Sequence, residues 1–193
     1  MMKLLVRLLA ILIDPFAEWA RIEKEPGDPI YLMTSYVALL ALIPAVFGFI
    51  GACVIGVIVR GTAPVRAPIL NGLFGAVFGY LAGFVLVVLL GLTVKLAAPL
   101  FGARRNFASA LNLAVYSYTP VWLAGVFLLL PGLRFLTLSG FYGVYLLIAG
   151  LSVMMKVPPS KLPGFAALVV AVACALTFIV AGAQHTLFGV PPV

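Results

Sequence analysis

Side chains that could carry acid–base or metal chemistry are confined to one end of this sequence. All five acidic residues lie within the first 28 positions: Asp14, Glu18, Glu23, Glu25 and Asp28. From Pro29 to Val193 there is no carboxylate side chain, and the single histidine, His185, lies near the C-terminus. Hydrolysis or group transfer needs a general base, an activated nucleophile or a metal ion. We therefore expect no catalytic residues, no metal site and no cofactor.

The remaining reactive side chains are isolated from one another. Cys53 and Cys174 both lie in apolar stretches, where a cysteine behaves as a small hydrophobic residue, so we predict neither a disulfide nor a metal site. An ion-coupled transporter normally carries ionisable residues inside its spans. The one candidate for such an intramembrane ionisable residue is Lys95. It lies at the end of an apolar stretch, where its side chain can reach the interface, so the sequence does not favour an ion-coupled transporter.

One stretch of the chain gathers uncharged polar side chains on a single helical face. Its members are spaced by 3, 4 and 3 residues, and they are Ser109, Asn112, Tyr116 and Thr119. Pro120 follows and cannot donate to the carbonyl of Tyr116, which predicts a kink. Such a face can line a cavity or ligand site, or it can fasten the helix to its neighbours by hydrogen bonds worth about 0.6 kcal/mol each. We expect Tyr142 and Tyr145 to meet it.

The elements that must position this face are membrane-spanning helices. The 193-residue chain is 65% hydrophobic and 9% charged, whereas a soluble domain carries about 25% charged residues. Crossing a bilayer takes about 20 apolar residues, and five stretches qualify: about 31–59, 69–94, 108–130, 135–155 and 164–183. The short linkers between them favour antiparallel neighbours. We predict an all-α, polytopic transmembrane helical bundle of about five spans.

The first 28 residues form an amphipathic segment of their own. The polar residues at spacings of 4, 7, 4 and 3 share one helical face, and they are Lys3, Arg7, Asp14, Glu18 and Arg21. The opposite, apolar face carries Trp19, which predicts a helix lying in the membrane interface with this face toward lipid. Asp14-Pro15 predicts a break in the helix. We divide the chain into this interfacial segment with its linker (1–28), serving as an anchor or a partner-docking surface, and a five-span domain (29–193).

Basic residues predict the orientation of the spans. With the N-terminus in the cytoplasm, nine fall on the cytoplasmic side: Lys3, Arg7, Arg21, Lys24, Lys95, Arg104, Arg105, Lys156 and Lys161. Three fall on the opposite side: Arg60, Arg66 and Arg134. The C-terminus is then outside. Because the positive charges are scattered singly between apolar runs, we expect no nucleic-acid binding. Four of them, Arg104, Arg105, Lys156 and Lys161, either set this topology or contact anionic lipid head groups.

Glycines in the second apolar stretch predict close helix packing. Gly75, Gly79 and Gly83 are spaced by four residues, a repeat that lets a neighbouring backbone approach closely. The neighbour is either another helix of the same bundle or a second copy of the chain, so the spacing leaves the oligomeric state open.

Two stretches resemble the Yip (Ypt-interacting protein) family. Tyr116-Ser117-Tyr118-Thr119-Pro120 is similar to that family's third span. The run from Tyr142 through Gly150 to Pro158, with Met154-Met155-Lys156-Val157-Pro158 at its end, is similar to the fourth span and the loop after it. Asp14-Pro15 with Trp19 looks like the entry motif of bacterial members. The resemblance implies five spans, a cytosolic N-terminus and no catalytic residues.

The family resemblance also shapes the functional expectation. Some eukaryotic members bind prenylated small GTPases through cytosolic surface, but here the cytosolic N-terminal part is only about the first 28 residues, which argues against GTPase binding. The chain looks more like the compact prokaryotic members, implying a bacterial cytoplasmic (inner) membrane. We expect a non-catalytic scaffold that shapes the bilayer or assembles partners, with lipids, other membrane proteins or itself as partners. The alternatives are a lipid-binding or lipid-moving protein, or a passive conduit for a small neutral or anionic solute.

Overall fold

The structure, a computed structural model, describes residues 2–25, 27–56 and 65–189. Within this part of the chain the elements are helices, and five segments are long and apolar enough to cross a membrane. They are Pro29–Ile55, Ile69–Phe101, Phe107–Leu129, Gly132–Met154 and Leu162–Phe188. The predicted all-α bundle of five spans is confirmed. The predicted end of the first span at residues 57–59, and Arg60 after it, lie outside the described residues.

Most spans are built from more than one helical segment. The first comprises α3 (Pro29–Tyr31), the π-helical η1 (Leu32–Val37), α4 (Ala38–Phe49) and the π-helical η2 (Ile50–Ile55). The second joins α5 (Ile69–Ala97) to the 3-10 helix η3 (Ala98–Phe101). The third contains α6 (Phe107–Ser117), α7 (Thr119–Ala124) and the 3-10 helix η4 (Gly125–Leu129). The fourth runs through the 3-10 helix η5 (Pro131–Phe141) into α8 (Tyr142–Met154), and the fifth is α9 (Leu162–Phe188).

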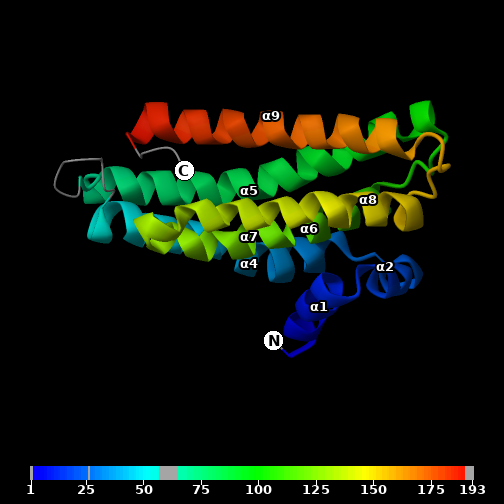
Figure 1. The fold of residues 1–193 in the computed structure, drawn as a ribbon, viewed down its shortest axis with the longest axis horizontal. Coiled ribbons are helices and arrows are strands. Elements are labelled where there is room, and N and C mark those ends of the chain that lie inside the picture. The colour runs from blue at the N-terminus through cyan, green and yellow to red at the C-terminus, as the bar shows by residue number, and fades with distance from the viewer. Residues whose placement is uncertain (1, 26, 57–64, 190–193) are drawn as a thin grey trace.

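The third span lies at the centre of the bundle. The span helices run side by side along the long axis of the molecule, with α9 lying along α5 on its outer side (Figure 1). In the most apolar part of the third span 67% of residues are buried, against 17% to 39% in the other four spans. A helix with protein on most sides can carry polar groups that lipid would not tolerate. The polar third span is therefore placed where its polarity costs least.

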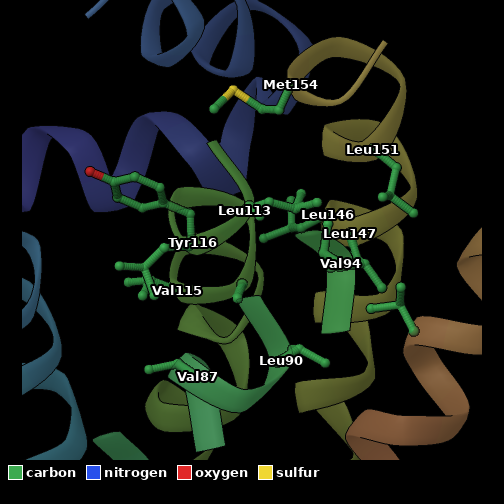
Figure 2. Close-up of a cluster of buried hydrophobic side chains, with 14 of the residues drawn as sticks. Val87, Leu90, Val94, Leu113, Val115, Tyr116, Leu146, Leu147, Leu151 and Met154 are labelled. Carbon is green, nitrogen blue, oxygen red and sulfur yellow. The ribbon is translucent and has the colours of Figure 1, made fainter. Parts of the chain in front are cut away.

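The hydrophobic core is formed where α5, α6 and α8 meet. Figure 2 shows Val87, Leu90 and Val94 of α5 directed toward side chains of α6 and α8. The facing residues are Leu113, Val115 and Tyr116 of α6, and Leu146, Leu147, Leu151 and Met154 of α8. Because lipid is as apolar as these side chains, dispersion contacts at close packing hold them together rather than expulsion of water.

The third span is interrupted just before Pro120, where the sequence predicts a kink. The α-helix ends at Ser117 and begins again at Thr119, with Pro120 in the first turn of the new helix. Glycines on both sides of the contact let neighbouring spans fit closely against this region, Gly143 in the fourth span and Gly125 in the third span itself. A Cβ on Gly143 of α8 would collide with the Ser117 carbonyl oxygen, and one on Gly125 would lie 2.7 Å from Cβ of Pro44 in α4. The two glycines let the fourth and first spans approach the broken helix from two sides.

The N-terminal segment forms two helices, α1 (Met2–Ile13) and α2 (Pro15–Lys24). The predicted break is correct, since Asp14 caps α2 by accepting a hydrogen bond from the Ala17 amide at 3.2 Å, and Pro15 begins the helix. The expectation that Trp19 faces lipid is wrong, because its side chain is fully buried in the protein. The α2 helix packs on α8, and this buries Glu18 together with Trp19.

Candidate functional site

The polar face of the third span contacts the first span and the N-terminal helices. The ring of Tyr116 lies edge-on to Tyr36 of η1, with centroids 4.8 Å apart, and edge-on to Trp19 of α2 at 6.1 Å. The Tyr36 hydroxyl and the Thr119 hydroxyl share a hydrogen bond of 2.8 Å, although 83 residues separate them. Aromatic pairs of this geometry contribute about 0.5–1.5 kcal/mol beyond their burial. The cluster thus links three separate segments of the chain at one point.

Arg7 of α1 supplies the positive charge beside this cluster. Its Nε lies 3.2 Å from Oε1 of Glu18, and its Nη2 lies 2.6 Å from Oε1 of Glu25. The guanidinium carbon lies 6.0 Å from the centre of the Tyr116 ring. Burial opposes the charged form of Arg7, but the hydrogen bond to Glu25 and the nearby carboxylates outweigh it and raise the Arg7 pKa. The buried Glu18 carboxylate therefore has a fixed counter-charge.

A cavity of about 190 Å³ lies between these charges and the third span. Asn112 and Tyr116 line it from α6, and Tyr36 lines it from η1. Arg7, Glu25 and Asp28 contribute charges of both signs to the same lining. A space of this size with paired charges and amide and hydroxyl groups suits ordered water. Ser109, one turn nearer the start of α6, is half-buried, and its backbone amide donates to the Asn106 cap at 3.5 Å.

Tyr142 and Tyr145 lie elsewhere than predicted. Both side chains are exposed on α8, and their rings pair with each other at 5.4 Å. The Tyr142 hydroxyl donates to the carbonyl oxygen of Leu12 at 2.9 Å, which ties α8 to the end of α1. The side of α8 that meets the kink is that of Gly143, since only a residue without a side chain fits against the Ser117 carbonyl. Its neighbour Tyr142 must then point away.

The four basic residues proposed to contact head groups separate into two pairs. Lys156 Nζ lies 2.6 Å from Oε1 of Glu23 in α2, and Arg104 Nη1 lies 3.6 Å from the same oxygen. The hydrogen bond from Lys156 lowers the pKa of Glu23. Arg105 and Lys161 are exposed. Glu23 of α2 thus contacts both the link between α5 and α6 and the link between α8 and α9, at one end of the bundle.

The glycine repeat of α5 faces neighbours in the same chain. The Gly75 carbonyl oxygen accepts a hydrogen bond of 2.9 Å from Nε2 of Gln184 in α9, and a Cβ on Gly79 would collide with the same amide. A Cβ on Gly83 would lie 3.6 Å from Cβ of Ala41 in α4. In the structure, close approach along this stripe is therefore intramolecular.

Sequence reasoning missed Tyr36 and the role of Arg7. No local pattern marks Tyr36, because its partner Thr119 lies in a different span. The structure buries Glu18, and a buried acid requires a counter-charge. The sequence placed Arg7 on the same helical face as Glu18, and this shared face was the signal that could have identified Arg7 as its partner. Among the described residues, no group of three or more histidine, cysteine, aspartate or glutamate side chains is placed to hold a metal ion.

Comparison with protein families shows to which family this chain is related. A model of the Yip1 domain matches residues 9–181. The chain belongs to the Yip1 domain family. The match begins within α1 and ends within α9, so it includes α2, the first four spans and most of the fifth span of this Yip-family protein. Searches with the chain found no match among the curated proteins or among the solved structures.

Proposed function

We propose that this Yip-family protein is a non-catalytic membrane scaffold that shapes the bilayer, with lipids as its principal partners. The observation that carries the proposal is a helix pair fixed to the bundle that leaves an apolar row uncovered. The exposed fractions of these side chains are between 52% and 79%, and the residues are Leu5, Val6, Leu9, Ile13 and Phe16. An apolar row of this kind enters the boundary between head groups and acyl chains.

The fixed attachment of α1 and α2 to the bundle is what would let this segment bend the bilayer, as a wedge inserted into one leaflet, in addition to anchoring the protein. The ion pairs of Arg7 with Glu18 and Glu25 hold α1 to α2. The buried Trp19 and the hydrogen bond from Tyr142 attach the helix pair to α8. Figure 1 shows α1 extending sideways from the bundle, near the end at which α2 lies. A flexible helix could adjust its depth to any bilayer, whereas a fixed one adds area to one leaflet only. With the orientation inferred from the basic residues, that leaflet is the cytoplasmic one.

Reconstitution into liposomes tests this proposal. The wild-type protein, at increasing protein-to-lipid ratios, should produce smaller or tubular vesicles by cryo-electron microscopy. The double variant Leu5→Ser with Leu9→Ser should leave vesicles similar to empty liposomes. The matched control, Ile179→Ser with Leu187→Ser, removes two apolar side chains of α9 that are each 66% exposed, and should behave as wild type. Reshaping by the α1 variant, or none by the wild type, would contradict the proposal.

A further inference from the structure

Two adjoining cavities lie beside α9; the larger lies toward the end of the bundle farthest from α2, and the other extends from it to the middle of the bundle. Their volumes are about 370 Å³ and 360 Å³. Tyr118, Val121, Thr137 and Thr177 line both, so the two spaces meet along a shared wall. The hydroxyls of Tyr118 and Thr177 share a hydrogen bond of 2.7 Å across that wall, joining the kinked third span to α9. Volumes of this size are typical of small-molecule sites.

Arg134 of η5 gives the larger cavity its charge. It is the one charged residue among the described residues that line this space. Its Nε atom is buried and has no hydrogen-bond partner within the described part of the chain. The sequence has no carboxylate side chain from Pro29 onward, so none of the five spans carries an acidic side chain that could pair with it. A partly buried cation of this kind is costly unless an anion reaches it.

Arg134 lies at a defined end of the bundle. It is near the beginning of the fourth span, whereas the ion pair of Lys156 with Glu23 lies just beyond that span's end. Gln184, close to the end of α9, and Gly75, close to the beginning of α5, line the same cavity. Arg134 and the Gln184 amide thus lie near the end of the bundle opposite to α2.

The second cavity has no charged residue among the described residues of its lining. Its lining is mostly apolar, and it extends from the shared wall along α8 and α9. Leu138, Phe141 and Leu147 line one side, and Val170 and Phe178 of α9 line the other. A charged end joined to an apolar channel within a membrane matches a molecule with an ionic head and a hydrocarbon chain.

We infer that these adjoining cavities bind one anionic phospholipid of the leaflet opposite to α1. The head-group phosphate accepts from the Arg134 guanidinium, and one acyl chain lies in the apolar cavity between α8 and α9. The charge selects an anionic lipid over a zwitterionic one, because the ammonium of a zwitterionic head group would face the same arginine. An arginine that merely extended to the interface would keep its Nε in water, whereas the Nε of Arg134 is buried.

Native mass spectrometry of the purified full-length protein tests the inference. The probes are phosphatidylglycerol and phosphatidylcholine with the same acyl chains, added at equal concentration to the detergent-solubilised protein. Wild type should retain phosphatidylglycerol preferentially. Arg134→Gln should reduce its retention by about tenfold or more, the loss expected for a charge-assisted hydrogen bond. The control Arg66→Gln removes an exposed cation at the same end of the bundle that lines neither cavity, and it should leave retention unchanged.

A second variant tests the acyl-chain half independently and does not alter the charge. Cys174 lines the apolar cavity only, and Cys174→Trp should fill it and reduce retention of phosphatidylglycerol while Arg134 stays in place. Glycerol phosphate, the head group without chains, should not compete. Equal retention of the two lipids by wild type, undiminished retention by Arg134→Gln or Cys174→Trp, or displacement by glycerol phosphate would each overturn the inference. None of these outcomes depends on bilayer shaping by α1.

Discussion

The contact between Gly150 of α8 and Trp19 of α2 allows a quantitative prediction about how the N-terminal helices are attached. A Cβ added at Gly150 would lie 2.7 Å from Cε2 of Trp19 and 2.8 Å from its Cζ2, and closer still to Cδ1 of Leu113. Ordinary van der Waals contact begins at 3.4 Å, so the indole must move by about 0.7 Å. The side chains of Trp19 and Leu113 are both fully buried, so neither has much room to move.

The expected effect of Gly150→Ala is the difference between two opposing terms. Overpacking of this kind costs about 1–3 kcal/mol, whereas replacing a helical glycine by alanine stabilises by about 0.5–1 kcal/mol. The two ranges leave a net loss of up to about 2.5 kcal/mol, which for a chain of this length lowers Tm by up to roughly 10 °C. The matched control is Gly182→Ala in α9, where nothing lies within 4 Å of the added Cβ and only the stabilising term remains.

The assay is thermal unfolding in detergent, followed by the fraction of protein that stays monodisperse after heating. A second substitution identifies the responsible contact. Trp19→Phe shortens the ring that Gly150→Ala displaces, so the double variant should be more stable than the sum of the two single changes predicts. If Gly150→Ala raised Tm as much as Gly182→Ala does, or if the two changes were simply additive, α2 would not be docked on α8 as described.

Three further predictions concern other contacts of the bundle. Because Lys156 lowers the pKa of Glu23, the folded state gains stability from this group above its ordinary value of 4.5 and loses it as the pH falls below that value. The protection of the α2 amides from hydrogen exchange, taken relative to their intrinsic exchange rates at each pH, should therefore fall on acidification, and less so in Glu23→Gln. Tyr36→Phe leaves the buried Thr119 hydroxyl without its partner and should lower stability by about 0.6–2 kcal/mol in the same thermal assay. In a variant without native cysteines, Ala103→Cys should resist an impermeant thiol reagent applied from outside intact cells; labelling there would reverse the proposed orientation.

Much of the fold was predictable because a membrane-spanning helix must have an apolar sequence of sufficient length. A helix that crosses hydrocarbon must be apolar for about 20 residues, and such a run stands out against polar linkers. The kink in the third span was predictable for the same local reason, since Pro120 lacks the amide that would continue the helix. The break at Asp14-Pro15 combines a capping side chain with a proline in the first turn of α2.

The attachment of the N-terminal helices was not predictable from their pattern. Amphipathicity indicates that one face of a helix avoids water, but lipid and protein are equally apolar, and the pattern cannot choose between them. Trp19 was assigned to lipid on this basis and is buried against α8 instead. The contact of Tyr36 with Thr119 depends on which spans lie together, and nothing local to either residue encodes that.

The uneven distribution of acids explains why the two ends of the bundle differ. At the end where α2 lies, Glu18, Glu23 and Glu25 pair with Arg7, Arg104 and Lys156, so the charges there hold protein to protein. At the other end the chain supplies Arg134 and no acid in any span. A cation partly buried in a membrane requires an anion, and where the described spans carry no acidic side chain the bilayer is an available source. The uneven distribution of acids thus underlies both proposals: paired charges that attach the proposed wedge at one end, and an arginine for the proposed lipid site at the other.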